Sequence, residues 1–241
     1  MTLTQRTDAV VATLAGVARD HAPAVLASSF GAEDMVLVDL IAHHVPSIGV
    51  FTLDTGRLPE ETHTLIDRVR DRYGLAIGVF APDASRVEDF VRANGVNAFY
   101  HSVDLRKACC AIRKTEPLAR ALAGKGAWIT GLRREQSVTR SDLPASEFDE
   151  VHGLPKFNPL AEWSEEDVWT YLRARQVPYN ALHDRGYRSI GCAPCTRAVE
   201  LGEDVRAGRW WWENPEQKEC GLHRRPVGFA RRAQPQEAIS P

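Results

Sequence analysis

The sequence predicts an α/β protein with a mostly parallel sheet and helices on both faces. Through the first half of the chain, short apolar runs alternate with amphipathic helical patterns. Parallel strands need helix-length crossovers, so this alternation favours a parallel sheet. The chain has 241 residues, of which 44% are hydrophobic and 26% charged, and this is enough to bury a substantial core.

Each predicted element follows from a local pattern. Four apolar runs predict buried strands, at residues 24–30, 48–54, 75–82 and 127–132. Helices are predicted between them, at residues 32–44, from Pro59 onward, at residues 85–94 and from near the adjacent cysteines 109 and 110. Glu60 and Glu61 follow Pro59 in the first helical turn, where the helix dipole favours acidic side chains.

The second half of the chain changes character. Ser164 and Asp167 fit a capping box, which predicts a helix over residues 164–176. After about residue 185 the sequence is loop-like and rich in cysteine, arginine and tryptophan. Residues 224–241 have no apolar periodicity and are predicted to form a mobile tail. We therefore expect one α/β domain over residues 1–200, followed by a smaller C-terminal region.

Composition narrows the classes of function. A formal net charge of −2 gives no reason to expect a nucleic acid as partner. The start, "MTLTQRTDAV", does not resemble a signal peptide, and no apolar run approaches the roughly 20 residues of a membrane span. We expect a soluble, cytoplasmic protein. In that reducing compartment, five cysteines favour metal or redox chemistry over a disulfide framework.

Polar segments follow three of the predicted strands. These segments read "SSFGAED", "LDTG" and "GLRREQS". Ligands of parallel α/β sheets bind at the carboxyl ends of the strands, where these segments would meet. The sequence therefore predicts a binding site along one edge of the sheet.

Two cysteine pairs could together form a metal site. Cys109 and Cys110 are adjacent, a spacing that resists a disulfide between them, and basic residues flank the pair. Cys192 and Cys195 form a CxxC motif. Four thiolates could bind a zinc ion or a [4Fe–4S] cluster, and unrelated buried or redox cysteines are a third interpretation. Lys114, about one helical turn after Cys110, could compensate the negative charge of either metal site.

Cys220 is left over and has a different setting. It lies in a short polar segment near the C-terminus, between Lys218 and His223. A thiol with cationic neighbours in such a segment is a candidate nucleophile. A tail cysteine without a chemical role is the alternative interpretation.

The motifs occur in an order that resembles one family. Between Ser28 and His223 the chain contains, in sequence, "SSFGAED", "LDTG", "CCAIRK", "GLRREQS", "KFNPL", "GCAPC", "GRWWWE" and "ECGLH". This set resembles the assimilatory phosphosulfate reductases, in their iron–sulfur branch of thioredoxin-dependent adenylyl-sulfate reductases. The resemblance implies a fold similar to that of the adenine-nucleotide α-hydrolase-like enzymes. A lone CxxC motif would carry much less information than this ordered set.

The resemblance also implies a reaction. Cys220, on a C-terminal lid formed by residues 201–223, would attack the sulfur of adenosine 5′-phosphosulfate and expel AMP. Thioredoxin would then attack the resulting S-sulfocysteine, release sulfite and form a transient mixed disulfide. A [4Fe–4S] cluster that carries no electrons in the reaction would be held by four cysteines, Cys109, Cys110, Cys192 and Cys195. The family also leads us to expect a homo-oligomer.

Cations are needed because the substrate is a multiply charged anion that a thiolate must approach. Lys114, Arg206 and Arg209 are the candidates, and His223 matches the active-site histidine of the family. Arg206 and Arg209 are three residues apart, a spacing that on a helical turn would aim both at one point. Without the resemblance, two solvated surface arginines would be the simpler interpretation.

Further residues are expected to bind the nucleotide. The resemblance places the backbones of Leu53 and Gly131 at the adenine edge. Ser28 and Ser29 belong to the phosphate-facing loop, with a simple helix cap as the alternative role. The anionic part of the substrate is assigned to two further side chains, Arg133 and Arg140, and Arg134 is expected at the surface. The three tryptophans at residues 210–212 are expected mainly to pack the base of the lid onto the body.

Three other functions compete with this interpretation. The nearest is reduction of the 3′-phosphorylated substrate, or of both nucleotides. A zinc-stabilised nucleotide-binding protein without redox turnover is the second. A tRNA-thiolating relative is the third, but the chain lacks an SGGxDS loop and its net charge is near neutral.

Overall fold

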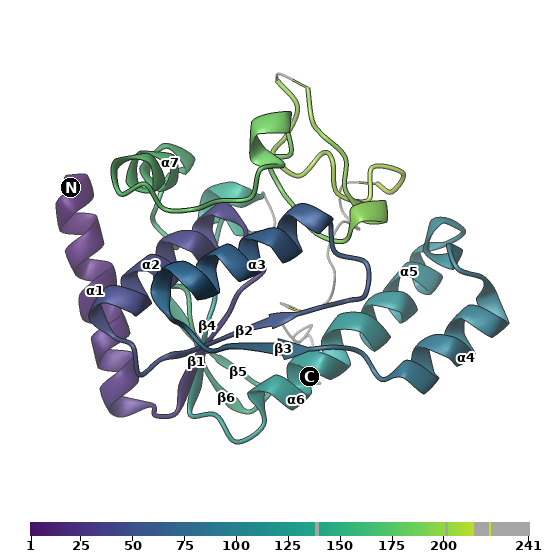
Figure 1. The fold of residues 1–241 in the computed structure, drawn as a ribbon, viewed down its shortest axis with the longest axis horizontal. Coiled ribbons are helices and arrows are strands. Elements are labelled where there is room, and N and C mark those ends of the chain that lie inside the picture. Colours follow the sequence, from purple (N-terminus) through teal and green to yellow (C-terminus); the bar gives the residue numbers. More distant parts are fainter. Residues whose placement is uncertain (138–139, 201, 215–221, 223–241) are drawn as a thin grey trace, which may run out of the picture.

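The sheet has six strands and is parallel except at one edge. The computed structural model describes residues 1–137, 140–200, 202–214 and 222 (Figure 1). The strand order is β3-β2-β1-β4-β6-β5, and only the β5–β6 pair is antiparallel. The strands are β1 (Ala24–Ala27), β2 (Gly49–Leu53), β3 (Ile77–Phe80), β4 (Ala127–Ile129), β5 (Ser146–Asp149) and β6 (Leu154–Phe157). The predicted mostly parallel sheet is confirmed.

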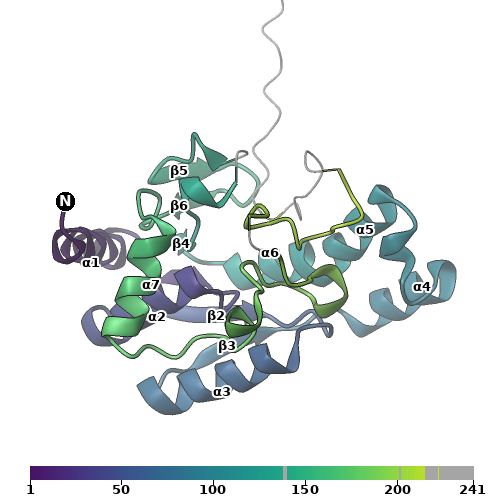
Figure 2. The ribbon, with the colours of Figure 1, turned by 90° about the horizontal axis from the view of Figure 1, so that it is seen from above.

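Helices cover both faces of this sheet, as predicted (Figures 1 and 2). The α-helices are α1 (Leu3–Asp20), α2 (Ala32–His44), α3 (Glu60–Tyr73), α4 (Ala84–Asn94), α5 (Val103–Cys110), α6 (Glu116–Leu122) and α7 (Glu165–Ala174). Apolar side chains of α1, α2, α3 and α7 form the main core with one face of β1, β2 and β4. Helix α6 packs against the other face of these strands. No helix in the described ranges is both long and apolar enough to cross a membrane.

The helix boundaries follow the sequence signals. Helix α3 begins after Pro59 and ends at Gly74, which adopts the left-handed conformation that glycine tolerates (φ 64°). Ser164 caps α7 and forms the predicted capping box with Asp167. Two kinds of element were not predicted. Helix α1 precedes the first apolar run, and β5 and β6 form a hairpin whose strands bury few side chains.

A π-helical turn lies directly after the adjacent cysteines. Residues Ala111–Thr115 form this turn between α5 and α6, so one nearly continuous helix contains a local widening. Such turns occur frequently at functional sites because they change the direction in which the side chains point. The side chain of Lys114 therefore points in a different direction than it would in a regular α-helix continued from Cys110.

A buried carboxylate links three helices of the main core. Asp39 of α2 accepts hydrogen bonds from the hydroxyl of Tyr73 at 2.7 Å and from that of Tyr171 at 2.6 Å. Asp39 and Tyr171 are both almost completely buried. These bonds tie the ends of α3 and α7 to α2, and they satisfy a charge that would be costly to bury alone.

We predict that Tyr171→Phe lowers the free energy of unfolding by about 1.5–3 kcal/mol, because a hydrogen bond to a buried charged acceptor is lost. Tyr179→Phe is the matched control, since its hydroxyl donates to Asp184 at an exposed position. The control should change stability by about 0.5 kcal/mol or less. Urea unfolding of both variants under one set of conditions measures the difference. Equal effects of the two substitutions would contradict the role given to Asp39.

Candidate functional site

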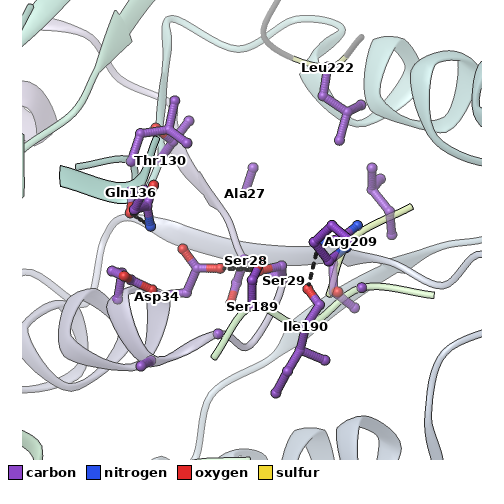
Figure 3. Close-up of a pocket in the computed structure, with 18 of the residues that line it drawn as sticks. Ala27, Ser28, Ser29, Asp34, Thr130, Gln136, Ser189, Ile190, Arg209 and Leu222 are labelled. Atoms are coloured by element: carbon purple, nitrogen blue, oxygen red, sulfur yellow. Dashed lines mark hydrogen bonds between the residues drawn. The ribbon is translucent and has the colours of Figure 1, made fainter. Parts of the chain in front are cut away.

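A cavity of about 220 Å³ lies at the carboxyl ends of β1, β2 and β4 (Figure 3). We call it the rim cavity. All three predicted polar segments contribute to its wall, through Ser28 and Ser29, Leu53, and Gly131. The expected position of the site is thus where an open parallel sheet places its ligand.

The loop after β1 is held by a buried carboxylate. Asp34 accepts a hydrogen bond from the backbone N–H of Ser29 at 2.6 Å and another from its Oγ at 2.8 Å. Ser28 Oγ accepts from the N–H of Phe30 at 3.1 Å. Neither serine caps α2, because its N-cap is Gly31 and makes no side-chain bond. Burial raises the pKa of Asp34 to about 6, against the bonds from Ser29, which lower it.

Gly131 must be a glycine for the loop to lie against this carboxylate. A Cβ at Gly131 would lie 2.3 Å from Oδ1 of Asp34. The segment after β4 thus packs directly on the segment after β1, and a side chain at position 131 would displace Asp34. Gly131 lines the rim cavity, and the predicted contact of its backbone with the adenine edge stays a prediction.

Three basic side chains contribute to the wall of the rim cavity. Lys114, Arg206 and Arg209 all line it, so the structure brings together the three cations expected at the site. Arg206 and Arg209 lie in consecutive turns instead of the expected helical turn. Arg209 is buried and its Nη1 donates to the carbonyl of Ile190 at 3.2 Å. Its guanidinium passes so close over Gly191 that a Cβ there would lie 2.3 Å from Nη2.

The two arginines expected to bind the anionic part of the substrate, Arg133 and Arg140, lie in different surroundings. Arg140 lines the rim cavity, with its Nη1 donating to Oε1 of Gln136 at 2.5 Å. Arg133 does not line it. Its buried guanidinium forms an ion pair with Oε1 of Glu33 at 2.8 Å and faces a neighbouring cavity. Glu33, in the first turn of α2, therefore holds Arg133 outside the rim cavity, away from the substrate-binding position predicted for it. Arg134 is half-exposed, as expected for a surface residue.

Some residues of the rim cavity carried no sequence signal. Arg188 and His183 contribute to its wall, as does Gln136 of the predicted "GLRREQS" segment. Arg188 follows a short 3₁₀-helix in the loop-like region and pairs with Glu165 at the start of α7. No motif distinguishes it from the other arginines of that region, so its position depends on the tertiary fold.

The four cysteines line one small chamber beside the rim cavity, which we call the cysteine chamber. Cys109 and Cys110 come from the end of α5, and Cys192 and Cys195 come from the distant CxxC segment. The basic residues of its wall are Arg57, Arg106, Arg113 and Lys114. The predicted pairing of the two cysteine motifs in space is therefore found in the fold, although the chain separates them by about 80 residues.

The chamber stabilises negative charge on sulfur unevenly. Burial alone would raise the pKa of Cys192, but Lys114, a hydrogen bond with Thr55 at 3.2 Å and Arg209 together lower it. The pKa of Cys195 rises to about 12 because of burial and the charge of Cys192. Burial also raises the pKa of Cys109, so a bound cationic centre would favour the thiolate form of Cys109 and Cys195.

Four cysteine side chains among basic residues in one chamber fit a [4Fe–4S] cluster. A [4Fe–4S] cluster binds each thiolate at a different iron, so its ligands need not converge on one point. In addition, the buried indole N–H of Trp210 lacks an acceptor among the described residues, and Trp210 lines the chamber. Cluster sulfur could accept this bond, and the four basic residues would offset the negative charge.

The two hollows share part of one wall. Lys114 and Trp210 line both the rim cavity and the cysteine chamber. An anion in the rim cavity and an anionic metal centre in the chamber would thus have Lys114 between them. Coulomb attraction to one lysine is one physical route by which the two sites could affect each other.

Two of the expected catalytic residues, Cys220 and His223, lie outside the described residues. Between them in the sequence, Leu222 is described. It lines the rim cavity and packs against the apolar side chains of β1, β2, β4 and α6 (Figure 3). The C-terminal motif "ECGLH" therefore contributes one residue to the cavity wall.

Comparison with known proteins places this arrangement in a family. Residues 23–198 match the model of the phosphoadenosine phosphosulfate reductase domain. Over 93% of this chain and 88% of the relative, the sequence is 58% identical to the adenosine 5′-phosphosulfate reductase of Allochromatium vinosum. The enzyme of the same name from Burkholderia cepacia is 56% identical over 92% of this chain and 88% of its own.

The chain belongs to the phosphoadenosine phosphosulfate reductase family.

Solved structures agree with this family assignment. A phosphoadenylyl-sulfate reductase from Candida auris, in complex with phosphate, has a TM-score of 0.68 and 28% identity. The match covers 79% of this chain and 90% of that one. An FMN adenylyltransferase from Candida glabrata, with FAD and pyrophosphate, has a TM-score of 0.56 at 14% identity and covers 95% and 81% of the two chains. The latter likeness shows a shared fold alone.

The buried Asp34 makes the stability of this reductase fold depend on pH. Its pKa is raised from 3.8 to about 6 in the folded state, so its favourable contribution is present at low pH and is lost as pH rises through about 6. We predict that the wild type loses up to about 3 kcal/mol of stability relative to Asp34→Asn between about pH 4 and pH 7.

Unfolding free energies of both proteins across this pH range measure the effect. Asp20→Asn is the control, because Asp20 is exposed and its pKa is lowered by Arg19. The control should show no loss in this direction. Parallel stability curves for the wild type and Asp34→Asn would contradict a buried, largely desolvated carboxyl at position 34.

Proposed function

We propose that this protein reduces adenosine 5′-phosphosulfate to sulfite and AMP, with Cys220 as the nucleophile. The observation that carries the proposal is the convergence of Lys114, Arg206 and Arg209 on a cavity whose wall also includes Leu222, two positions after Cys220. Three cations around a sheet-end cavity suit a phosphosulfate, which spreads its charge over several oxygens. The names of the most similar relatives support the choice of substrate.

The first step transfers a sulfo (SO3) group. The thiolate of Cys220 attacks the sulfur of the sulfate group, and the bond from that sulfur to the bridging oxygen breaks. AMP leaves with the electron pair, and Cys220 becomes S-sulfocysteine. Lys114, Arg206 and Arg209 screen the repulsion between thiolate and substrate and stabilise the charge on the leaving phosphate. His223 contacts the phosphosulfate in this scheme.

The second step needs a dithiol. Thioredoxin attacks Sγ of Cys220, sulfite leaves with the electron pair of the broken S–S bond, and a mixed disulfide forms. The second thiol of thioredoxin then attacks this disulfide and releases the Cys220 thiolate. The dithiol supplies both electrons that reduce the sulfur. Residues 201–223 act as a lid in this cycle, in a cytoplasmic homo-oligomer.

Nucleotide binding uses the rim cavity. The backbones of Leu53 and Gly131 read the adenine edge, and Ser28 and Ser29 form the loop around the polar part of the nucleotide. Arg140 remains a candidate for an anionic group because it lines the cavity. Arg133 is not retained in this role, since Glu33 holds its guanidinium outside the cavity.

A [4Fe–4S] cluster belongs to this proposal as the resident cofactor. It would be held in the cysteine chamber by Cys109, Cys110, Cys192 and Cys195. When bound, it supplies a fixed charged centre beside the substrate site and no electrons for the reaction. Lys114 lies in the wall between chamber and cavity, and here it balances charge on both sides.

Reduction of the 3′-phosphorylated nucleotide is the second candidate. The Candida auris structure favours it, because that relative is a phosphoadenylyl-sulfate reductase and shares the fold over most of both chains. Arg188 and Arg140 also supply positive charge in the rim cavity that a 3′-phosphate could use. The greater identity to adenosine 5′-phosphosulfate reductases favours the unphosphorylated substrate.

Mass spectrometry of the protein mixed with substrate, without thioredoxin, tests the reaction. We predict a sulfonate adduct on Cys220, formed faster with adenosine 5′-phosphosulfate than with its 3′-phosphorylated form. Cys220→Ser should form no adduct and should lower turnover by about a thousandfold or more. Turnover that survives this substitution would refute the nucleophile, and faster reaction of the 3′-phosphorylated substrate would favour the second candidate.

Metal analysis tests the cofactor with the same type of substitution. We predict iron and acid-labile sulfide in the purified wild type, and loss of most of both in Cys192→Ser, because one thiolate ligand is removed. Cys220→Ser is the matched control and should keep its iron. Colourless wild-type protein that contains zinc and neither iron nor sulfide would contradict the cluster.

A further inference from the structure

Trp210 lines both the cysteine chamber and the rim cavity. One arginine from each of the two sites packs against it. Arg106 lines the chamber, and its guanidinium carbon is 4.8 Å from the centre of a Trp210 ring. Arg209 lines the rim cavity, and its guanidinium carbon is 4.7 Å from that ring. Both distances are within the range of cation–π contact. The indole is almost completely buried, so neither contact is weakened by water.

Arg106 is held in place by the residues that follow Trp210. Its Nε donates to Oε1 of Glu213 at 2.9 Å and its Nη2 to Oε2 at 2.7 Å, a bidentate arrangement. The side chain of Arg106 is fully buried, and that of Glu213 is 3% exposed. The N–H of Glu213 donates to the carbonyl of Trp210 at 2.8 Å, which closes a short turn around the stacked ring.

Backbone contacts fix the position of this segment, and the backbone of Trp210 itself is strained. Trp210 donates its N–H to the carbonyl of Cys195 at 3.2 Å, and Arg209 forms an isolated antiparallel bridge with Thr196. Trp210 has a φ of 41°, in the left-handed region that bulky residues rarely adopt. Such a conformation persists only when the surrounding contacts enforce it. The Arg106–Glu213 pair is a fully buried contact of that kind.

We propose that Arg106 is a positioning residue for anion binding in the rim cavity. Held by Glu213, it fixes the Trp210 ring, and the ring in turn fixes the guanidinium of Arg209 over Gly191. The pair of Arg106 and Glu213 has no net charge, so its effect on a bound anion is geometric. This route is separate from Lys114, which acts by its own charge.

The sign of one substitution distinguishes geometry from charge. Glu213→Gln removes a negative charge from the wall region, so electrostatics alone would tighten the binding of an anion. If Arg106 acts by positioning, loosening its bidentate contact instead weakens anion binding. Adenosine, which has no phosphate, should be insensitive to the position of Arg209.

The experiment measures the dissociation constants of AMP and adenosine by calorimetry, on protein whose iron content has been matched. We expect Glu213→Gln to weaken AMP binding about tenfold, a factor between those for losing an exposed and a fully desolvated cation–π contact, and to leave adenosine binding unchanged. Arg106→Lys keeps the charge but loses the planar fork, and it should have the same effect. This second variant tests the inference if Glu213→Gln folds poorly.

Glu203→Gln is the matched control. Glu203 forms a similar bidentate pair with Arg197 in the same part of the chain, with distances of 2.8 and 3.0 Å, and neither residue lines the two hollows. The control should leave AMP binding within about twofold, because it changes charge by the same amount without touching the stack. In an Arg209→Ala background, Glu213→Gln should then add little, since both act through one guanidinium.

Any of three results with the variants would overturn the inference: tighter AMP binding by Glu213→Gln, an equal loss for AMP and adenosine, or full additivity with Arg209→Ala. The inference rests on the proposed nucleotide site, but the two fail separately. A protein that binds AMP and forms no Cys220 adduct would refute the proposed reaction alone. A wild type that binds AMP no better than adenosine would overturn the inference, because Arg209 would then hold no anion.

Discussion

Two sites for negative charge share one wall in this protein, and this constraint organises the rest of the structure. Four cysteine sulfurs on one side and a phosphosulfate on the other would repel each other across a few side chains. Lys114 and Trp210 form the shared wall, with Arg106 and Arg113 on the chamber side and Arg206 and Arg209 on the cavity side. The cations therefore stand where both sites need them, which makes a near-neutral chain locally basic.

The fold builds this wall from segments far apart in the sequence. We call the segment between β2 and α3, residues 54–59, the β2 loop. Arg113, in the π-helical turn after the adjacent cysteines, donates to the carbonyl of Thr55 in this loop at 2.7 Å. The N–H of Ala193, in the CxxC segment, donates to the backbone carbonyl of Arg57 in the same loop at 2.8 Å. The β2 loop thus contacts both cysteine motifs. The loop also lines both sites, through Arg57 in the chamber and Thr55 in the cavity.

The sequence was most informative where a short pattern has one physical meaning. Apolar runs located β1 to β4, and the two cysteine motifs identified the chamber, because thiols with cationic neighbours have few structural uses. The sequence did not predict side-chain positions that depend on a partner far away in the chain. Glu33, a hundred residues earlier, holds Arg133 outside the cavity, and Arg188 enters it without any motif. The hairpin of β5 and β6 buries too few side chains to show an apolar pattern.

The most direct test of the shared wall is a crystal structure of the iron-loaded protein with AMP, with anomalous diffraction recorded at the iron edge. The account predicts iron within the chamber bounded by Cys109, Cys110, Cys192 and Cys195. It also predicts the phosphate of AMP beside Arg206 and Arg209, with Lys114 between the two. Iron elsewhere, or a phosphate bound on the far side of the cavity from Lys114, would contradict it.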